Sequence, residues 1–120
     1  MHLDPFMKHL GFEGRITAPG EARMSVQLKH EHLNNWGSAH GGFLFALADS
    51  AFALASNSHG TLAVSLAAHI EHLAPCAAGD TLEAVAREVS LTRKTGVYQV
   101  EIRAGDKLVA LFTGTVYRKG

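Results

Sequence analysis

The segment from Phe43 to Ala55 constrains the fold of this chain more than any other segment. Its sequence, FLFALADSAFALA, is apolar on every side of a helix with 3.6 residues per turn. Such a helix is stable only where other parts of a protein wrap around it, so we expect the rest of the chain to surround it. The run falls short of the roughly 20 apolar residues that cross a bilayer, so we predict no membrane span.

Asp49 is the one residue of this segment that contradicts its apolar setting. An ionised carboxylate among Phe, Leu and Ala costs several kcal/mol unless partners or water reach it. One interpretation is a functional carboxylate, because perturbed acidic groups gather at active sites. The other is a structural aspartate paired with a buried arginine or a backbone donor.

Strand-like alternation flanks the helical segment on both sides. Residues 21–29 place Ala22, Met24, Val26 and Leu28 on one face, and residues 96–103 do the same with Tyr98, Val100 and Ile102. Further strands are predicted over residues 12–17, 62–73, 81–92 and 108–117. A short helix should follow Asp4 and Pro5, which read as an N-cap and a first helical residue, and end at Gly11.

Short turns connect the predicted strands at the end of the chain. Residues 104–107, with the sequence AGDK, form a hairpin turn. Consecutive strands joined by hairpins make an antiparallel sheet, and each strand has one apolar face, so the sheet should curl around the apolar helix. We therefore predict an α+β fold, built as a single domain over residues 1–120.

Composition excludes several classes of function. The chain has 11 Lys and Arg against 11 Asp and Glu, so it has no basic field for a nucleic acid. Its single cysteine, Cys76, forbids an internal disulfide, and the start of the chain lacks the pattern of an export signal. We expect a cytoplasmic protein. Cys76 has no basic neighbour in sequence that would make it a nucleophile.

Histidines are numerous but do not form a metal-binding pattern. His30 and His32 share a face if their segment is extended, whereas His69 and His72 point to opposite faces of a strand. No cysteine or carboxylate stands at ligand spacing beside them. We predict no metal site.

His40, Gly41 and Gly42 directly precede the helical segment. The first N–H groups of a helix have no intrahelical acceptor, and a glycine lets a ligand carbonyl approach them closely. A free N–H at a helix start can stabilise an oxyanion. The alternative is that two glycines simply make the turn into the helix.

Gly41 and Asp49 cannot serve one site within one chain. Eight residues along a helix separate them by about 12 Å of axial rise. If the same helix of a second subunit runs alongside in the opposite direction under two-fold symmetry, Asp49 of each chain approaches Gly41 of the other. The spacing therefore predicts a homodimer with shared active sites.

These residues also form a known pattern. Asn34, Gly37, His40-Gly41-Gly42 and then Leu47-Ala48-Asp49 resemble the signature of hotdog-fold acyl-CoA thioesterases of the phenylacetate-degradation type. The similarity extends to the opening at residues 4–7, to residues 51–53, to the turn from Pro75 to Gly79 and Asp80, and to residues 108–110. The resemblance implies a hotdog fold, in which a curved antiparallel sheet wraps a long central helix. It also implies dimers that join their sheets and a tetramer built from two such dimers.

The resemblance implies a role for each residue of the pattern. The Gly41 N–H would polarise the thioester carbonyl, with Gly42 beside it, and Asp49 of the other subunit would attack that carbonyl or activate a water. Asn34 would position the nucleophile or the carbonyl. His40 would brace the loop and the sulfur side of the thioester.

Other residues would contact the rest of the substrate. Ser65 is the nearest match to a water-holding Ser or Thr that some relatives carry after the helix, although its spacing differs. Coenzyme A carries phosphates that need cations, and Arg93, Lys94 and Thr95 resemble the basic turn of related enzymes; the alternative is an ordinary solvated turn. No separate cofactor is implied, because coenzyme A is part of the substrate.

The predicted function is hydrolysis of an acyl-CoA, most of all an aryl- or arylacetyl-CoA such as phenylacetyl-CoA or hydroxyphenylacetyl-CoA, to a free acid and CoA. The chain has no G-x-S-x-G elbow for a serine nucleophile. Two alternatives stay open. One is an acyl-CoA hydratase or dehydratase on the same fold, which would pair a histidine with the carboxylate. The other is a module that binds acyl-CoA without cleaving it.

Overall fold

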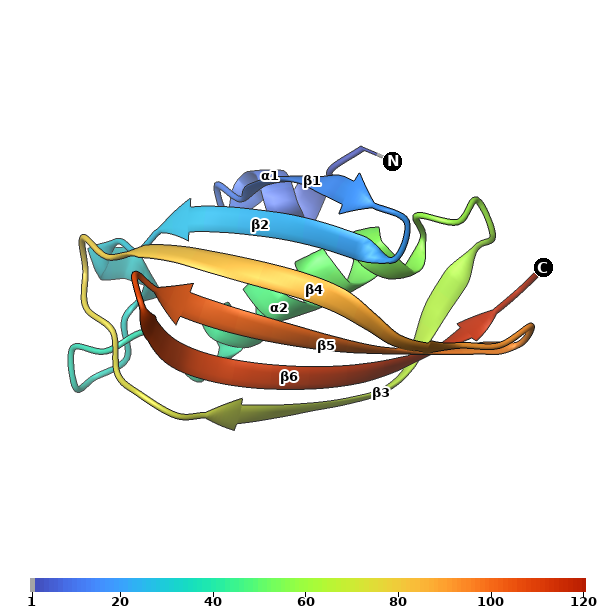
Figure 1. Ribbon diagram of the computed structural model, residues 1–120. Coiled ribbons are helices and arrows are strands. Elements are labelled where there is room, and N and C mark those ends of the chain that lie inside the picture. Colours follow the sequence, from blue (N-terminus) through green and yellow to red (C-terminus); the bar gives the residue numbers. More distant parts are fainter. Residues whose placement is uncertain (1) are drawn as a thin grey trace.

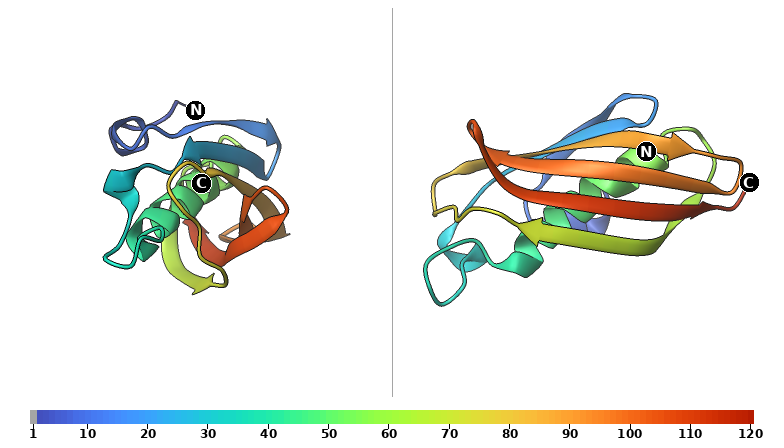
Figure 2. Two further views of the ribbon diagram at one scale, coloured as in Figure 1. Left: turned by 90° about the vertical axis from the view of Figure 1, so that its left-hand side faces the viewer. Right: turned by 60° about the horizontal axis from the view of Figure 1, so that its bottom comes forward.

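The computed structural model describes residues 2–120, which form two helices and six strands. In chain order these are α1 (Pro5–His9), β1 (Glu13–Ala18), β2 (Glu21–Gln27), α2 (Gly41–Ser56), β3 (Ala63–His72), β4 (Thr81–Leu91), β5 (Thr95–Ala104) and β6 (Lys107–Arg118). A short 3-10 turn over His30–His32 lies between β2 and α2. All strand pairs are antiparallel, in the order β1-β2-β4-β5-β6-β3. Figures 1 and 2 show the sheet curving around α2.

Local sequence signals set the ends of both helices. The side chain of Asp4 accepts a hydrogen bond from the Met7 N–H at 2.8 Å and caps α1, as predicted. At the C-terminal end of α2, the side chain of Asn57 donates to the Ala53 carbonyl and accepts from the N–H of Ala63, both at 3.0 Å. This side chain therefore ends the helix and joins it to the first residue of β3.

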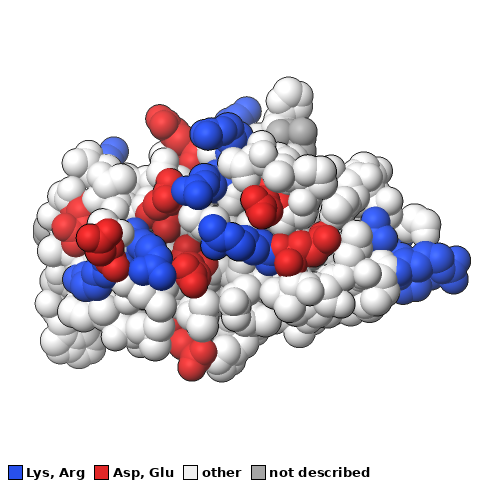
Figure 3. Space-filling view, viewed as in Figure 1, with Lys and Arg blue, Asp and Glu red and all other residues white. Residues whose placement is uncertain are grey.

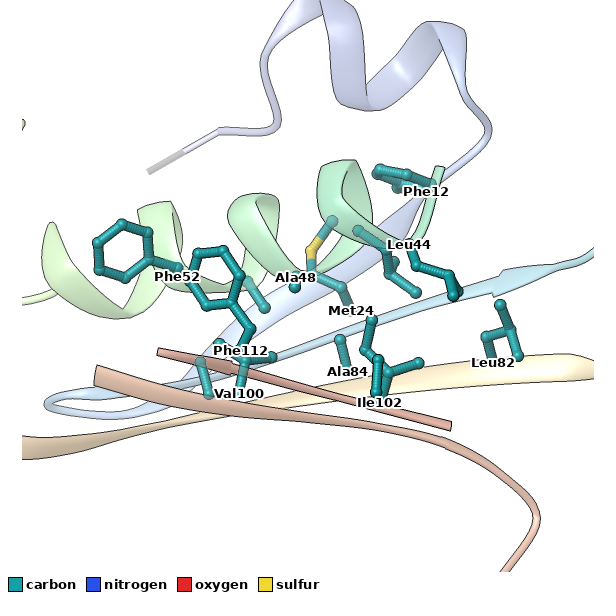
Figure 4. Close-up of a cluster of buried hydrophobic side chains, with 14 of the residues drawn as sticks. Phe12, Met24, Leu44, Ala48, Phe52, Leu82, Ala84, Val100, Ile102 and Phe112 are labelled. Carbon is teal, nitrogen blue, oxygen red and sulfur yellow. The ribbon is translucent and has the colours of Figure 1, made fainter. Parts of the chain in front are cut away.

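The core lies between α2 and the concave face of the sheet. Leu44, Ala48 and Phe52 point toward β2, β4, β5 and β6, as Figure 4 shows. The predicted inward residues of β2 and β5 are all buried, which confirms the alternation that identified these strands. Gly114 on β6 makes room for Phe52, since a Cβ on Gly114 would lie 2.7 Å from Cζ of that ring.

One side of α2 is left uncovered within a single chain. Phe45 is 36% exposed, and Ala46, Asp49 and Ala53 are partly exposed along the same stripe. Within one chain the sheet therefore wraps α2 as predicted but reaches only part of the way around it. The neighbouring edge strand β3 is also bare, with Leu66 62% exposed.

A polar cluster joins the far end of α2 to the sheet. Oε2 of Glu88 accepts from the Tyr98 hydroxyl at 2.6 Å and lies 2.6 Å from Nε2 of His59. Burial of Glu88 raises its pKa, but the hydrogen bonds from Tyr98 and His59 outweigh this effect, so the pKa lies below its usual value. Burial and the contact with Glu88 raise the pKa of Tyr98. The cluster is thus an ionised carboxylate held by two ring side chains.

Candidate active site

The loop before α2 is organised by Asn34. Its Oδ1 accepts hydrogen bonds from the N–H groups of Trp36 at 2.9 Å and Ser38 at 3.1 Å. The Asn34 N–H donates to the Ser38 carbonyl at 2.7 Å, which closes the loop from both sides. With the amide oxygen used in this way, the Nδ2 amide remains available to donate to a ligand.

His40 is the N-cap of α2 and determines which backbone N–H stays free. Its Nδ1 accepts from the Gly42 N–H at 2.9 Å, and its carbonyl accepts from the N–H groups of Phe43 and Leu44. Within residues 2–120, only the N–H of Gly41 among the first four of the helix has no acceptor. The helix start therefore presents a single directed donor.

The free N–H of Gly41 belongs to a surface hollow of about 410 Å³. Asn34, Ser38, Ala39 and the Gly41–Leu44 turn form one wall, and the end of β3 with the following loop, His72–Pro75, forms the other. His72 stands closest to the helix: its Nε2 lies 3.3 Å from where a Cβ on Gly41 would be. Two of the predicted site residues, Asn34 and Gly41, therefore line one hollow together with His72.

Asp49 does not line this hollow. It lies two turns further along α2, on the uncovered stripe of the helix. Burial raises the pKa of its carboxyl, and the charge of Asp4 at the start of α1 raises it further. The carboxylate is therefore more basic than an ordinary aspartate and faces a surface that a second chain can reach.

The residues predicted to contact the rest of the substrate lie outside the hollow. Ser65 is an exposed residue of β3 at a register shift against β6. Arg93 and Lys94 occupy the β4–β5 turn, at the opposite end of the molecule from the loop before α2 (Figure 1). One chain alone therefore does not bring them to Gly41.

The β4–β5 turn is a hydrogen-bonded, basic end of the molecule. The hydroxyls of Thr92 and Thr95 lie 2.8 Å apart, so Thr95 is used within the turn. Nη1 of Arg118 donates to the Thr92 carbonyl at 2.8 Å, which adds the guanidinium of β6 to this end. The blue surface at the right of Figure 3 marks the cations gathered there.

A second, apolar cleft of about 290 Å³ flanks the other side of the helix start. Phe6 and Leu10 of the N-terminal segment line it together with Phe43 and Ala46 of α2. The ring of His32 stacks on Phe43 with centroids 4.0 Å apart. His30 and His32 lie in a 3-10 turn, so the extended backbone that would place both on one face is not formed there.

The described residues do not favour a metal site or a reactive cysteine. No group of three His, Cys, Asp or Glu side chains within residues 2–120 is arranged to hold a metal ion. Cys76 is 4% exposed, and burial raises the pKa of its thiol, which disfavours the reactive thiolate. Neither helix in this part of the chain is long and apolar enough to cross a membrane.

Comparison with known proteins decides the family. The sequence profile of the thioesterase superfamily matches residues 37–111, which include the start of α2, His72 and the other lining residues of the hollow except Asn34. This chain belongs to the thioesterase superfamily. The match confirms the prediction made from Asn34, the His40-Gly41-Gly42 run and Asp49, and it makes the protein a thioester hydrolase.

Individual relatives agree with this assignment. The acyl-coenzyme A thioesterase PaaI of Escherichia coli is 43% identical over 98% of this thioesterase and 84% of its own length. A relative from Archaeoglobus fulgidus is 47% identical over 82% of the chain, which spans only 65% of that protein.

Solved structures show the same fold. A mutant of the phenylacetic acid degradation protein PaaI from Thermus thermophilus matches with a TM-score of 0.92 and 53% identity, over 96% of this chain and 99% of that one. A Streptococcus mutans protein bound to acetyl-CoA matches with a TM-score of 0.86 and 33% identity, over 91% and 89%. The thioesterase is therefore of the PaaI type, and the predicted α+β hotdog fold is confirmed.

Proposed function

We propose that this thioesterase hydrolyses aryl- or arylacetyl-CoA to a carboxylic acid and free CoA, in sites that two subunits share. The observation that carries the proposal is the N–H of Gly41, which has no acceptor within residues 2–120 and lies at a hollow beside Asn34. A thioester carbonyl that accepts this N–H gains a preorganised partner for its developing negative charge. No separate cofactor is needed for this chemistry.

Asp49 of the other subunit supplies the base or nucleophile in this proposal. The uncovered stripe of α2 and the bare edge strand β3 lie next to each other, so they support a two-fold dimer that extends the sheet and pairs the helices. Two antiparallel copies of α2 would bring Asp49 of one chain to Gly41 of the other. Two such dimers would form the tetramer, in the cytoplasm.

The reaction then follows from the positions of the donors. Either Asp49 takes a proton from water as the water oxygen attacks the thioester carbon, or Asp49 attacks and water hydrolyses the resulting anhydride. Asn34 orients the nucleophile or the carbonyl. The C–S bond breaks, and the CoA thiolate leaves and takes up a proton.

His40 acts on the sulfur side through its remaining ring nitrogen. Because Nδ1 accepts from the Gly42 N–H, the neutral ring carries its proton on Nε2. That proton can be donated as a hydrogen bond to the leaving sulfur. Gly42 contributes by leaving the approach to Gly41 open.

The CoA part of the substrate would contact the partner subunit as well. In an antiparallel helix pair, the β4–β5 turn of the partner extends past the start of α2. Arg93 and Lys94 there, with Thr95 shaping the turn, would hold CoA phosphates. Ser65 would hold a water. The apolar cleft between α1 and α2 has room for an aryl ring.

Thiol release from a panel of acyl-CoA thioesters tests this function. Phenylacetyl-CoA and hydroxyphenylacetyl-CoA should be hydrolysed with a higher kcat/KM than straight-chain acyl-CoA. Asp49→Asn should lose about 10³-fold in kcat, the scale of general-base catalysis, while Asp106→Asn in the exposed β5–β6 turn should keep the wild-type rate. Wild-type turnover by Asp49→Asn would refute the mechanism.

The same assay separates the alternatives. A hydratase would change the acyl group and release no thiol. A binding module would retain acyl-CoA without either reaction.

Shared sites can be tested with hybrid dimers. Gly41→Pro removes the free N–H, and proline suits this position because it is the first helical residue and His40 before it is extended. Gly41→Ala keeps the N–H but adds a Cβ 3.3 Å from Nε2 of His72, so it measures the effect of added bulk separately from the loss of the donor. Mixing Asp49→Ala with Gly41→Pro subunits should restore roughly a quarter of wild-type activity, since half of the dimers are hybrids with one intact site. No recovery in verified hybrids would refute sharing.

A further inference from the structure

We propose that His72 is a second hydrogen-bond donor to the thioester oxygen at Gly41, an inference that rests on the proposed function. His72 is the last residue of the edge strand β3 and pairs with Ala110 of β6. The N–H of Leu73 donates to the Val109 carbonyl at 2.9 Å, which holds the backbone on the following side as well. The ring therefore projects from a fixed stretch of backbone.

The position of the ring relative to Gly41 carries the inference. Nε2 lies 3.3 Å, and Cε1 3.4 Å, from the place a Cβ of Gly41 would occupy. Since a Cβ lies about 2.5 Å from its own backbone nitrogen, Nε2 is within about 5.8 Å of the Gly41 nitrogen. Two hydrogen bonds of about 2.9 Å span that distance, so one oxygen can accept from both nitrogens.

The ring has no competing partner in the described chain. No hydrogen bond within residues 2–120 involves a ring nitrogen of His72, in contrast to His32, His40 and His59. Both His72 and Gly41 face the same hollow, beside Asn34. A second donor there would strengthen an oxyanion site that otherwise relies on one backbone N–H.

The chemistry requires only a hydrogen bond. The neutral ring with its proton on Nε2 donates to the carbonyl oxygen, more strongly as that oxygen gains charge, and the proton stays on the ring throughout. His72 is therefore assigned to oxyanion stabilisation and not to proton transfer.

Two variants separate donation from packing. His72→Phe keeps a planar ring but removes the donor, and His72→Gln keeps a donor on a side chain of similar reach. We expect His72→Phe to lower kcat about 100-fold, the cost of losing one oxyanion donor, with KM changed less than about threefold. His72→Gln should stay within about tenfold of wild type. Thermal denaturation of both variants checks that the fold is intact.

A spectroscopic measurement makes the result independent of turnover. The infrared carbonyl band of ¹³C-labelled phenylacetyl-CoA bound to the Asp49→Asn protein should lie at lower frequency than in solution. In the Asp49→Asn protein, the further change His72→Phe should move the band part of the way back toward its frequency in solution. His72→Gln should move it little. A carbonyl band that His72→Phe leaves unchanged, or equal losses of kcat in the Phe and Gln variants, would overturn the assignment. Failure of the proposed function would appear instead as wild-type protein that releases no thiol.

Discussion

The N–H of Gly42 donates to Nδ1 of His40 at 2.9 Å, and this bond leaves Gly41 as the free donor at the start of α2. One side chain therefore caps the helix and shapes the proposed oxyanion site. The same bond turns Nε2 of His40 into the ring nitrogen that carries the proton. Stability and catalysis at this position should be separable by substitution.

Replacing His40 tests the capping role. His40→Ala should lower the free energy of unfolding by about 1 kcal/mol, because the Gly42 N–H loses its acceptor. His40→Asn should cost less, since an asparagine side chain accepts from the same N–H. Urea denaturation at constant m-value measures both variants. Equal losses in the two would show that the cap contributes nothing.

Replacing Asp4 tests the electrostatic setting of Asp49. Burial and the charge of Asp4 both raise the pKa of Asp49. As the pH is lowered, activity that needs an ionised Asp49 should therefore begin to fall at a pH above the usual pKa range of aspartate. Asp4→Asn removes the like charge, while its side-chain oxygen can still cap α1. The acid limb of kcat/KM against pH should then move to lower pH. Asp106→Asn, the control, should leave the limb in place.

Replacing Glu88 tests the polar cluster with His59 and Tyr98. A carboxyl whose pKa is lowered in the folded state stabilises the protein above its unfolded pKa, and this stabilisation is lost as pH falls through the folded value. Glu88→Gln should therefore cost about 2 kcal/mol at pH 7 and flatten the loss of stability in acid. Chemical denaturation at several pH values from about 3 to about 7 measures both the loss at neutral pH and the dependence of the unfolding free energy on pH.

Glu83 provides the matched control for Glu88. It pairs with Arg23 at 3.0 Å, and its side chain is 50% exposed against 23% for Glu88. Exposed pairs contribute little, so Glu83→Gln should stay within about 0.5 kcal/mol of wild type. A larger loss for Glu83→Gln than for Glu88→Gln would contradict the prediction.

Replacing Gly114 tests the packing of Phe52. A methyl group there would lie 2.7 Å from Cζ of the ring, so Gly114→Ala should cost about 1–3 kcal/mol through overpacking. Phe52→Leu in the same chain removes the ring and should recover part of the loss. Double-mutant analysis of the unfolding free energies gives the coupling. Simple additivity of the two changes would mean that the ring moves aside freely.

Local features of the fold were predictable from the sequence. The N-cap at Asp4, the alternation around Met24 and Val100, and the extent of α2 all follow from caps and periodicity within a few residues. The strand order was not predictable, because β3 pairs with β6 and not with β4, its neighbour in sequence. That order depends on how the whole sheet closes around α2.

Part of the candidate site could also be predicted from the sequence and part could not. Gly41 and Asp49 could be predicted from their positions on one helix, whereas Asn34 and His40 were predicted from the resemblance to a family signature. His72 was not predicted, since it appeared in the sequence only as one of several histidines on a strand. Its position beside Gly41 bridges 31 residues and exists only because β3 ends beside the start of α2.

The sequence by itself determined that Gly41 and Asp49 stand on one helix about 12 Å apart, because the rise per residue of a helix is the same wherever the helix is placed. Tertiary structure decided what each of them faces. The sheet covers the apolar side of α2, leaves Asp49 on an open stripe, and sets His72 against Gly41. These contacts arise between segments distant in sequence, so only the closure of the sheet around the helix creates them.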